Sequence, residues 1–280
     1  MPVTPGPMEI YYETRGEPDA APALFISGFS SQMLGWRETF CHRFVERGVR
    51  VILFDNRDVG LSPKLGGPSD VDGGYGLRDM AADGFAVLDA LGVERAHLVG
   101  QSMGGMIAQV MAMMHPGRVR SISLIYSAPS LEPRYFVARE TVDAVEAGIR
   151  LDRRQAIEAF VDRERISGSV AYAFDEVWIR ELAALCYDRC YAPDGVLRQR
   201  AAMARWQGRT GDLERLSMPA CVIHGRDDCH IRPEASVALA AALRNAELHL
   251  YPGLGHELAA PLWDDFATCI TRTMRRAHET

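Results

Sequence analysis

One short segment constrains the fold of this chain more than any other feature. Residues 97–106 read His-Leu-Val-Gly-Gln-Ser-Met-Gly-Gly-Met, which places a Gly-x-Ser-x-Gly pattern between an apolar run and an amphipathic helical pattern. A serine on a strained strand-to-helix turn needs glycine on both sides, because larger side chains would clash there. The alternative is an ordinary turn with a serine N-cap. The strand, the helix and both glycines together favour a nucleophilic Ser102 at a helix N-terminus, where the helix dipole favours negative charge.

Elsewhere in the chain, strand-like runs alternate with helical patterns. Most of the runs are continuously apolar, as expected for strands buried on both faces of a parallel sheet. The alternation therefore predicts an open α/β sheet flanked by helices. The predicted strands are Ile10–Glu13, Leu24–Ser27, Val51–Asp55, His97–Gly100, Ser121–Tyr126, Cys221–His224 and Leu248–Tyr251. The predicted core helices are Trp36–Arg47, Leu77–Leu91, Met103–Met114, Ala235–Leu243 and Leu262–Arg276.

Residues 131–213 break this alternation, since they contain helical patterns rich in Glu, Arg and Ala and no strand-like run. A structureless loop of that length would be unusual inside a domain. We therefore expect residues 1–130 and 214–280 to form the core and residues 131–213 to form a helical lid. The helical patterns of the lid are Val137–Ile149, Arg153–Ile166, Asp175–Asp188 and Val196–Gln207.

Composition excludes several classes of function. The 31 basic and 37 acidic residues are interspersed and give a net charge of −6, so neither nucleic acid nor an anionic membrane is an expected partner. No run approaches the ~18 apolar residues of a membrane span, and no basic, apolar leader begins the chain, so a cytoplasmic location is the default expectation. Six cysteines without a Cys-x-x-Cys pair favour reduced, structural thiols.

A serine nucleophile needs a base to take its proton and a carboxylate to orient that base. In a fold of this kind the partners follow the serine in the order acid, then histidine. Asp227 and Asp228 follow one predicted strand, and His256 follows the last one. Both loops leave the carboxyl ends of strands, where open α/β sheets assemble their sites. The alternatives are an aspartate pair that only shapes a turn and a histidine that is merely a surface polar residue.

Two further segments carry a resemblance to a known family. They are Ser27-Gly28-Phe29-Ser30 with Leu34-Gly35-Trp36, and Phe54-Asp55-Asn56-Arg57-Asp58-Val59-Gly60-Leu61-Ser62. With the serine motif, they resemble the α/β-hydrolase fold family, and within it the esterase branch that includes aclacinomycin methylesterases. The resemblance extends from Phe25 to His256 and is weakest in the lid.

The resemblance implies a mostly parallel sheet flanked by helices, with a helical lid inserted after the sixth strand. It implies that the backbone N–H groups of Phe29 and Met103 form the oxyanion hole, that Asp228 is the acid with Asp227 as the fallback, and that His256 is the base. The chain departs from the family at Ser27, where many members have histidine. No catalytic atom is lost by that change.

These residues predict a two-step acyl transfer on a small-molecule carboxylic ester or lactone with an apolar group. This reaction requires no metal and no organic cofactor. A zinc site is also not expected, because the sequence has neither a His-x-x-x-His nor a Cys-x-x-Cys pair. The proposed substrate-binding residues are Gly28, Met33, Trp36 and Leu254. Aromatic residues of the lid could join them, although packing is the favoured role for most of Tyr135, Phe136, Trp178 and Trp206.

Three alternatives use the same residues. The triad could cleave a carbon–carbon bond in a β-diketone-like substrate, or it could pass the acyl group to an alcohol or a peroxide. A hydrolase scaffold could also act as a small-molecule receptor with little turnover. The arginines of the lid are expected to form a solvated face, with a clamp for an anionic substrate as the alternative.

Overall fold

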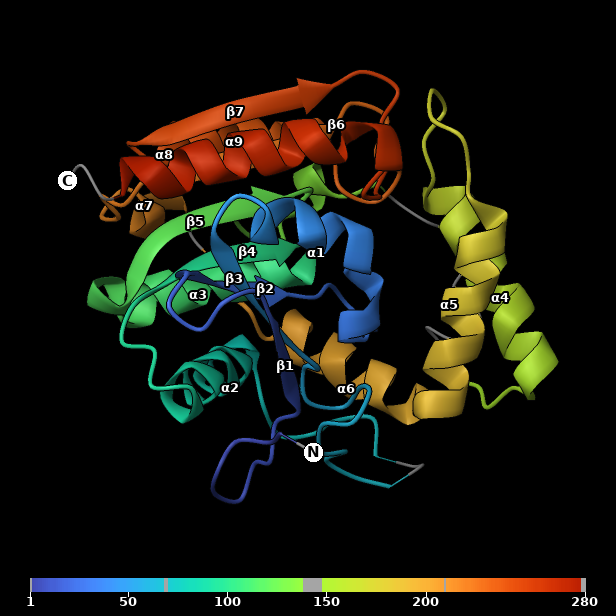
Figure 1. Cartoon of the computed structure of the whole chain (residues 1–280). Coiled ribbons are helices and arrows are strands. Elements are labelled where there is room, and N and C mark those ends of the chain that lie inside the picture. The colour runs from blue at the N-terminus through green and yellow to red at the C-terminus, as the bar shows by residue number, and fades with distance from the viewer. Residues whose placement is uncertain (1, 68–69, 138–147, 209, 278–280) are drawn as a thin grey trace.

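The computed structural model describes residues 2–67, 70–137, 148–208 and 210–277. Seven strands form one sheet in the order β1-β3-β2-β4-β5-β6-β7 (Figure 1). Strand β1 runs antiparallel to β3, and the other neighbouring strands are parallel. The strands are β1 Tyr12–Arg15, β2 Ala21–Ile26, β3 Val49–Phe54, β4 Ala96–Gln101, β5 Val119–Ile125, β6 Ala220–Gly225 and β7 Ala246–Tyr251.

All seven predicted strands are confirmed, with ends shifted by at most three residues. The interior strands β4 and β6 are buried at every position, which explains why their sequences are mostly apolar. Strand β7 lies at the edge of the sheet and has a partly exposed face, where Leu248 and Leu250 are each more than a third exposed.

Helices cover both faces of the sheet and explain its burial. Helices α1 and α9 pack on one face, whereas α2, α3 and α8 pack on the other, with α7 against α8 (Figure 1). These five helices confirm the predicted core helices: α1 Glu38–Val45, α2 Leu77–Ala90, α3 Met103–Met114, α8 Pro233–Ala242 and α9 Trp263–Arg276, with α7 at Thr210–Leu213. Short 3-10 turns lie at Met33–Gly35, Pro116–Arg118, Pro133–Tyr135 and Ala260–Leu262. No helix of the described chain has the length and apolar character needed to span a membrane.

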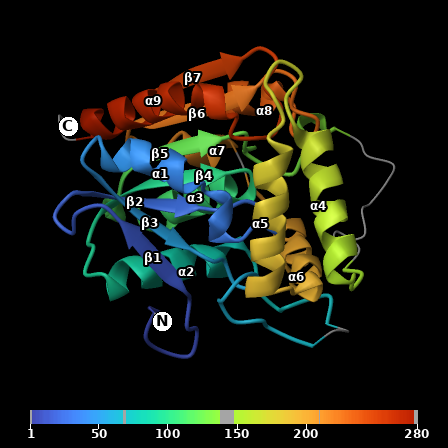
Figure 2. The same cartoon turned by 45° about the vertical axis from the view of Figure 1, so that its right-hand side comes forward.

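Three more helices stand beyond the carboxyl ends of the strands. They are α4 Arg153–Ser167, α5 Glu176–Arg189 and α6 Pro193–Ala204, and they match three of the four helical patterns expected there. Figure 2 shows them side by side at one end of the sheet. Most of the fourth pattern, Val137–Ile149, lies outside the described residues. The division of the chain into a core and a lid stays a prediction.

The expected place of this helical segment, after the sixth strand, was wrong by one strand. Among the described residues it follows β5 and precedes β6. The strands predicted from the sequence also place it between Ser121–Tyr126 and Cys221–His224, which are the fifth and sixth of the seven. The position after the sixth strand came only from the family resemblance.

Two buried ion pairs hold the turn that follows β3. The Arg57 guanidinium donates to both carboxylate oxygens of Asp83 on α2, at 2.6 and 2.7 Å. Asp58 accepts from Arg198 of α6 at 2.8 Å, and both side chains are almost fully buried. These contacts give Arg57 and Asp58 a structural role and fasten α6 to the core.

The Arg57–Asp83 pair provides a test of this packing. Arg57→Ala leaves the Asp83 carboxylate buried without its partner, so we expect a loss of about 3–5 kcal/mol in the free energy of unfolding. Urea denaturation measures this loss. The matched control is Arg153→Ala, which removes an exposed pair with Asp188 and should cost no more than about 1 kcal/mol. Equal losses in the two variants would contradict the assigned role.

Candidate active site

Ser102 occupies a strained turn between β4 and α3. Its backbone has φ 52° and ψ −121°, a conformation that residues other than glycine rarely adopt. A Cβ atom at Gly100 would lie 2.3 Å from the carbonyl oxygen of Gly104, and one at Gly104 would lie 2.0 Å from that of Ile26. Both glycines of the motif are therefore required by close backbone packing. The Ser102 N–H donates to the carbonyl of Ile125 at 2.9 Å, which ties the turn to β5.

Asp228 follows β6 and has a fully buried carboxylate. Its Oδ2 lies 2.6 Å from Nδ1 of His256, and its Oδ1 accepts the backbone N–H groups of His230 and Ile231 at 2.8 and 2.9 Å. His224 Nε2 lies 3.2 Å from the same Oδ2. Because an ionised carboxylate only accepts, Nδ1 of His256 must carry the proton, and its Nε2 is then able to accept one.

The charge state of Asp228 follows from these neighbours. Burial alone would raise its pKa, but His256 and His224, with their hydrogen bonds, outweigh burial and hold the pKa of this carboxyl well below its usual range. Asp228 therefore stays ionised in neutral and mildly acidic solution.

Asp227, the fallback acid of the sequence, occupies a different environment. Its side chain is exposed and accepts the backbone N–H of Gly253 at 2.7 Å. That bond joins the loop after β6 to the loop after β7. The structure thus brings Asp228, and not Asp227, to the imidazole.

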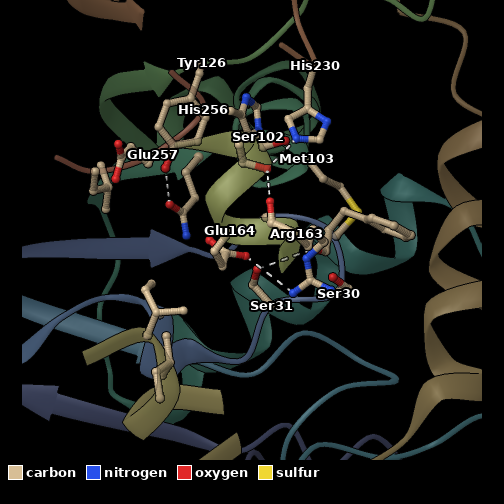
Figure 3. Close-up of a pocket in the computed structure, with 18 of the residues that line it drawn as sticks. Ser30, Ser31, Ser102, Met103, Tyr126, Arg163, Glu164, His230, His256 and Glu257 are labelled. Atoms are coloured by element: carbon tan, nitrogen blue, oxygen red, sulfur yellow. Dashed lines mark hydrogen bonds and ion pairs between the residues drawn. The ribbon is translucent and has the colours of Figure 1, made fainter. Parts of the chain in front are cut away.

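Aromatic rings fix the position of His256. Its ring centre lies 4.4 Å from that of Tyr126 and 4.8 Å from that of His230. Tyr126 has a positive φ of 36° and donates its hydroxyl to the side chain of Gln101. Figure 3 shows Ser102, His256 and His230 gathered on one side of a pocket.

This pocket is a cavity of about 430 Å³ at the carboxyl edge of the sheet. The residues that line it include Ser102, His256, Gly28, Phe29 and Met103. A Cβ atom at Gly28 would lie only 3.3 Å from Cβ of Ser102, so the loop after β2 packs directly against the serine. Met103 begins α3, where N–H groups have no carbonyl partner within the helix.

Three of the predicted substrate-binding residues do not line the cavity. Met33, Trp36 and Leu254 are at most 2% exposed and belong to the core on the face covered by α1 and α9. Trp36 stacks on Phe40 with ring centres 6.0 Å apart, which explains its burial. An apolar side chain near such a motif can either pack in the core or line a pocket, and these three side chains pack in the core.

The aromatic residues expected in the lid divide between two roles. Phe136 and Trp178 line the cavity, whereas Tyr135 and Trp206 pack against the core. The sequence did not identify Arg163, His230 and other polar residues of the cavity wall. In the sequence, the indication that His230 lies at this site is its position two residues after Asp228. Among the described residues, no group of three or more His, Cys, Asp or Glu side chains is placed to hold a metal ion.

The end of α4 is bonded to the loops that follow β6 and β7. The carbonyl of Ser167 accepts the N–H of His256 at 2.8 Å, and the Ser167 hydroxyl lies 2.7 Å from Nε2 of His230. The Ser169 hydroxyl accepts the N–H of Gly255 at 3.0 Å. The helical segment therefore supports the loop that carries His256.

The fold and this cavity together define an α/β enzyme of the hydrolase class. Residues 22–260 match the family model described as the alpha/beta hydrolase fold, and the chain belongs to that family. This confirms the expected fold, a mostly parallel sheet flanked by helices.

Three relatives illustrate the similarity. The RutD protein of Variovorax paradoxus is 28% identical over 89% of this chain and 90% of its own. The rhodomycin D methylesterase DnrP of Streptomyces peucetius is 24% identical over 98% of both chains, which supports the resemblance to methylesterases. A 2-hydroxymuconate semialdehyde hydrolase of Pseudomonas putida is 30% identical over 74% of this chain and 70% of its own.

Gly255 offers a test of the contact between α4 and the His256 loop. A Cβ atom there would lie 2.4 Å from the carbonyl oxygen of Gly168, so Gly255→Ala must push the two segments apart. We expect a loss of about 1–3 kcal/mol in unfolding free energy and slower labelling of Ser102 by a fluorophosphonate.

The matched control is Gly117→Ala, because a Cβ atom at Gly117 would have no neighbour within 4 Å. It should leave both the stability and the labelling rate unchanged. Normal labelling of the Gly255→Ala protein would show that the contact does not position the site.

Proposed function

We propose that this protein hydrolyses a carboxylic ester or a lactone that carries a substantial apolar group. Ser102 is the nucleophile, His256 the base and Asp228 the acid. The observation that carries the proposal is the 2.6 Å contact between Asp228 and His256, made at the cavity that Ser102 lines. In the family resemblance these three positions are the catalytic ones.

The reaction proceeds through an acyl-enzyme. The hydroxyl oxygen of Ser102 attacks the ester carbonyl as Nε2 of His256 takes its proton, while Asp228 stabilises the charged imidazole. The tetrahedral oxyanion accepts hydrogen bonds from the N–H groups of Phe29 and Met103, each worth about 3–4 kcal/mol in comparable sites. The imidazolium then protonates the leaving alcohol. Water attacks the acyl-enzyme with the same base, which releases the acid and restores the Ser102 hydroxyl.

The walls of the cavity support a substrate with apolar character. The volume of about 430 Å³ suits a small to medium-sized organic molecule. Its apolar lining includes Phe136, Phe160, Phe174, Trp178 and Leu182. The similarity to a methylesterase agrees with an ester substrate.

A second candidate is hydrolysis of a carbon–carbon bond by the same three residues. It is favoured by the similarity to the 2-hydroxymuconate semialdehyde hydrolase. Product analysis distinguishes the two functions, because an ester gives an acid and an alcohol whereas a β-diketone gives an acid and a ketone. Acyl products formed with an added alcohol or peroxide would indicate acyl transfer instead.

The nucleophile is tested by Ser102→Ala. Removal of the attacking oxygen should abolish hydrolysis of aryl and alkyl esters of increasing acyl length, and it should also abolish labelling by a fluorophosphonate. The melting temperature of the variant confirms that it is folded. Full activity of this variant would refute the assignment. Labelling of the native protein without turnover of any ester would favour a receptor.

The acid is tested by Asp228→Asn beside Asp227→Asn. An amide at position 228 keeps an acceptor for the N–H groups of His230 and Ile231 but no longer fixes the tautomer of His256, so kcat should fall about 10,000-fold. Asp227→Asn keeps an acceptor for Gly253 and should change kcat less than threefold. Steady-state ester hydrolysis measures both values. A larger loss at position 227 would reverse the assignment of the acid.

A further inference from the structure

A partly buried arginine lines the cavity and has no function in the reaction described above. Arg163 belongs to α4, and its side chain is only 14% exposed. Figure 3 shows it with Glu164, Ser30 and Ser31 below Ser102, in the part of the pocket away from His256. Its guanidinium is charged at every relevant pH, so the pocket contains a permanent positive charge.

The ion pairing of Arg163 differs from that of the other buried arginines. In the ion pairs of the described residues, four more arginines have side chains less than a fifth exposed, and each has a carboxylate oxygen within 2.8 Å. These pairs are Arg37 with Asp175, Arg57 with Asp83, Arg189 with Asp55 and Arg198 with Asp58. Arg163 has its carboxylate partner, Glu164, at 3.5 Å. Its charge is thus the least compensated of the five.

The geometry of this weak pair explains its length. Arg163 and Glu164 are neighbours on one helix, and side chains at adjacent helical positions do not face each other. The guanidinium also lies over the ring of Phe160, 4.7 Å from its centre, which keeps it along the cavity wall. A planar guanidinium in this position has donors available for a two-point contact with another carboxylate.

Arg163 also lies where two cavities adjoin. A second cavity of about 100 Å³ shares Ser30, Ser31, Gly35, Phe160 and Arg163 with the main one. The two serine hydroxyls add hydrogen-bonding capacity beside the charge. A group attached to the substrate at some distance from its ester can therefore reach a polar, positively charged position.

We propose that Arg163 binds a carboxylate carried by the substrate, so that the preferred substrates are esters or lactones with a second, anionic end. This inference rests on the proposed function and narrows its substrate class. Glu164 and Glu257 also line the cavity. Glu257 already accepts the N–H of Ser169 at 2.7 Å, which leaves Glu164 as the nearer source of repulsion for an anion.

The test compares matched esters that differ only in charge. The 4-nitrophenyl half-esters of glutaric, adipic and suberic acid are compared with their distal methyl esters, and release of nitrophenolate is measured above the spontaneous rate. A charge-assisted contact predicts a kcat/KM about 10- to 100-fold higher for the best half-ester than for its methyl ester. Arg163→Leu should bring this ratio to about one, and Glu164→Gln should raise it.

The control is Arg153→Leu, which removes an exposed charge from the same helix and should leave the ratio unchanged. A ratio near one in the native protein at all three lengths would overturn the proposal, as would an unchanged ratio in Arg163→Leu. Addition of salt should lower the ratio in the native protein.

Binding is measured separately, so that failure of the proposed function can be distinguished. In the Ser102→Ala background, calorimetry with monomethyl adipate and monomethyl suberate should show at least tenfold weaker binding when Arg163 is also changed to Leu. If no ester is hydrolysed but this difference is found, the esterase proposal fails and the carboxylate site stands. Equal binding by the two proteins overturns the carboxylate site.

Discussion

A single buried carboxylate fixes the arrangement of the two loops that follow β6 and β7. Asp228 has no exposure to water, so its charge persists only because imidazole and backbone donors surround both of its oxygens. The same donors that stabilise the charge also orient the imidazole of His256. Stability of the loops and orientation of this imidazole therefore depend on one set of contacts, and neither loop can move far without leaving a buried charge uncompensated.

Helix α4 extends this set of contacts into the helical segment. Ser167 contacts the loops after β6 and β7, through its carbonyl to His256 and through its hydroxyl to His230. Arg198 of α6 is paired with Asp58 of the core. Helix α5 is also attached to the core, because its Arg189 is paired with Asp55 and its N-cap residue Asp175 with Arg37. The helices that complete the cavity are thus attached to the core at several separated places.

The sequence predicted the features that depend on local pattern. Apolar runs, most of them continuous, located all seven strands, and the glycines around Ser102 located the turn because backbone packing admits no other residue there. Features that depend on where a side chain points in the folded protein could not be predicted. Asp227 and Asp228 are adjacent, and only burial separates the one that meets His256 from the one that closes a loop. Met33, Trp36 and Leu254 were assigned to the pocket because an apolar side chain near a motif satisfies a core and a cavity equally.

The same limit applies to Arg163, which the sequence cannot separate from the solvated arginines around it. Its importance comes from the contrast between apolar walls and one weakly compensated charge. Apolar walls distinguish ligands poorly, since one methylene changes binding by only about 1–3 kcal/mol. A buried charge discriminates more strongly. A ligand that lacks the matching group displaces water from the guanidinium and makes no hydrogen bond or ion pair to replace it. In this cavity, selectivity should therefore depend on the weakly compensated charge of Arg163, while the aromatic walls supply affinity for many substrates.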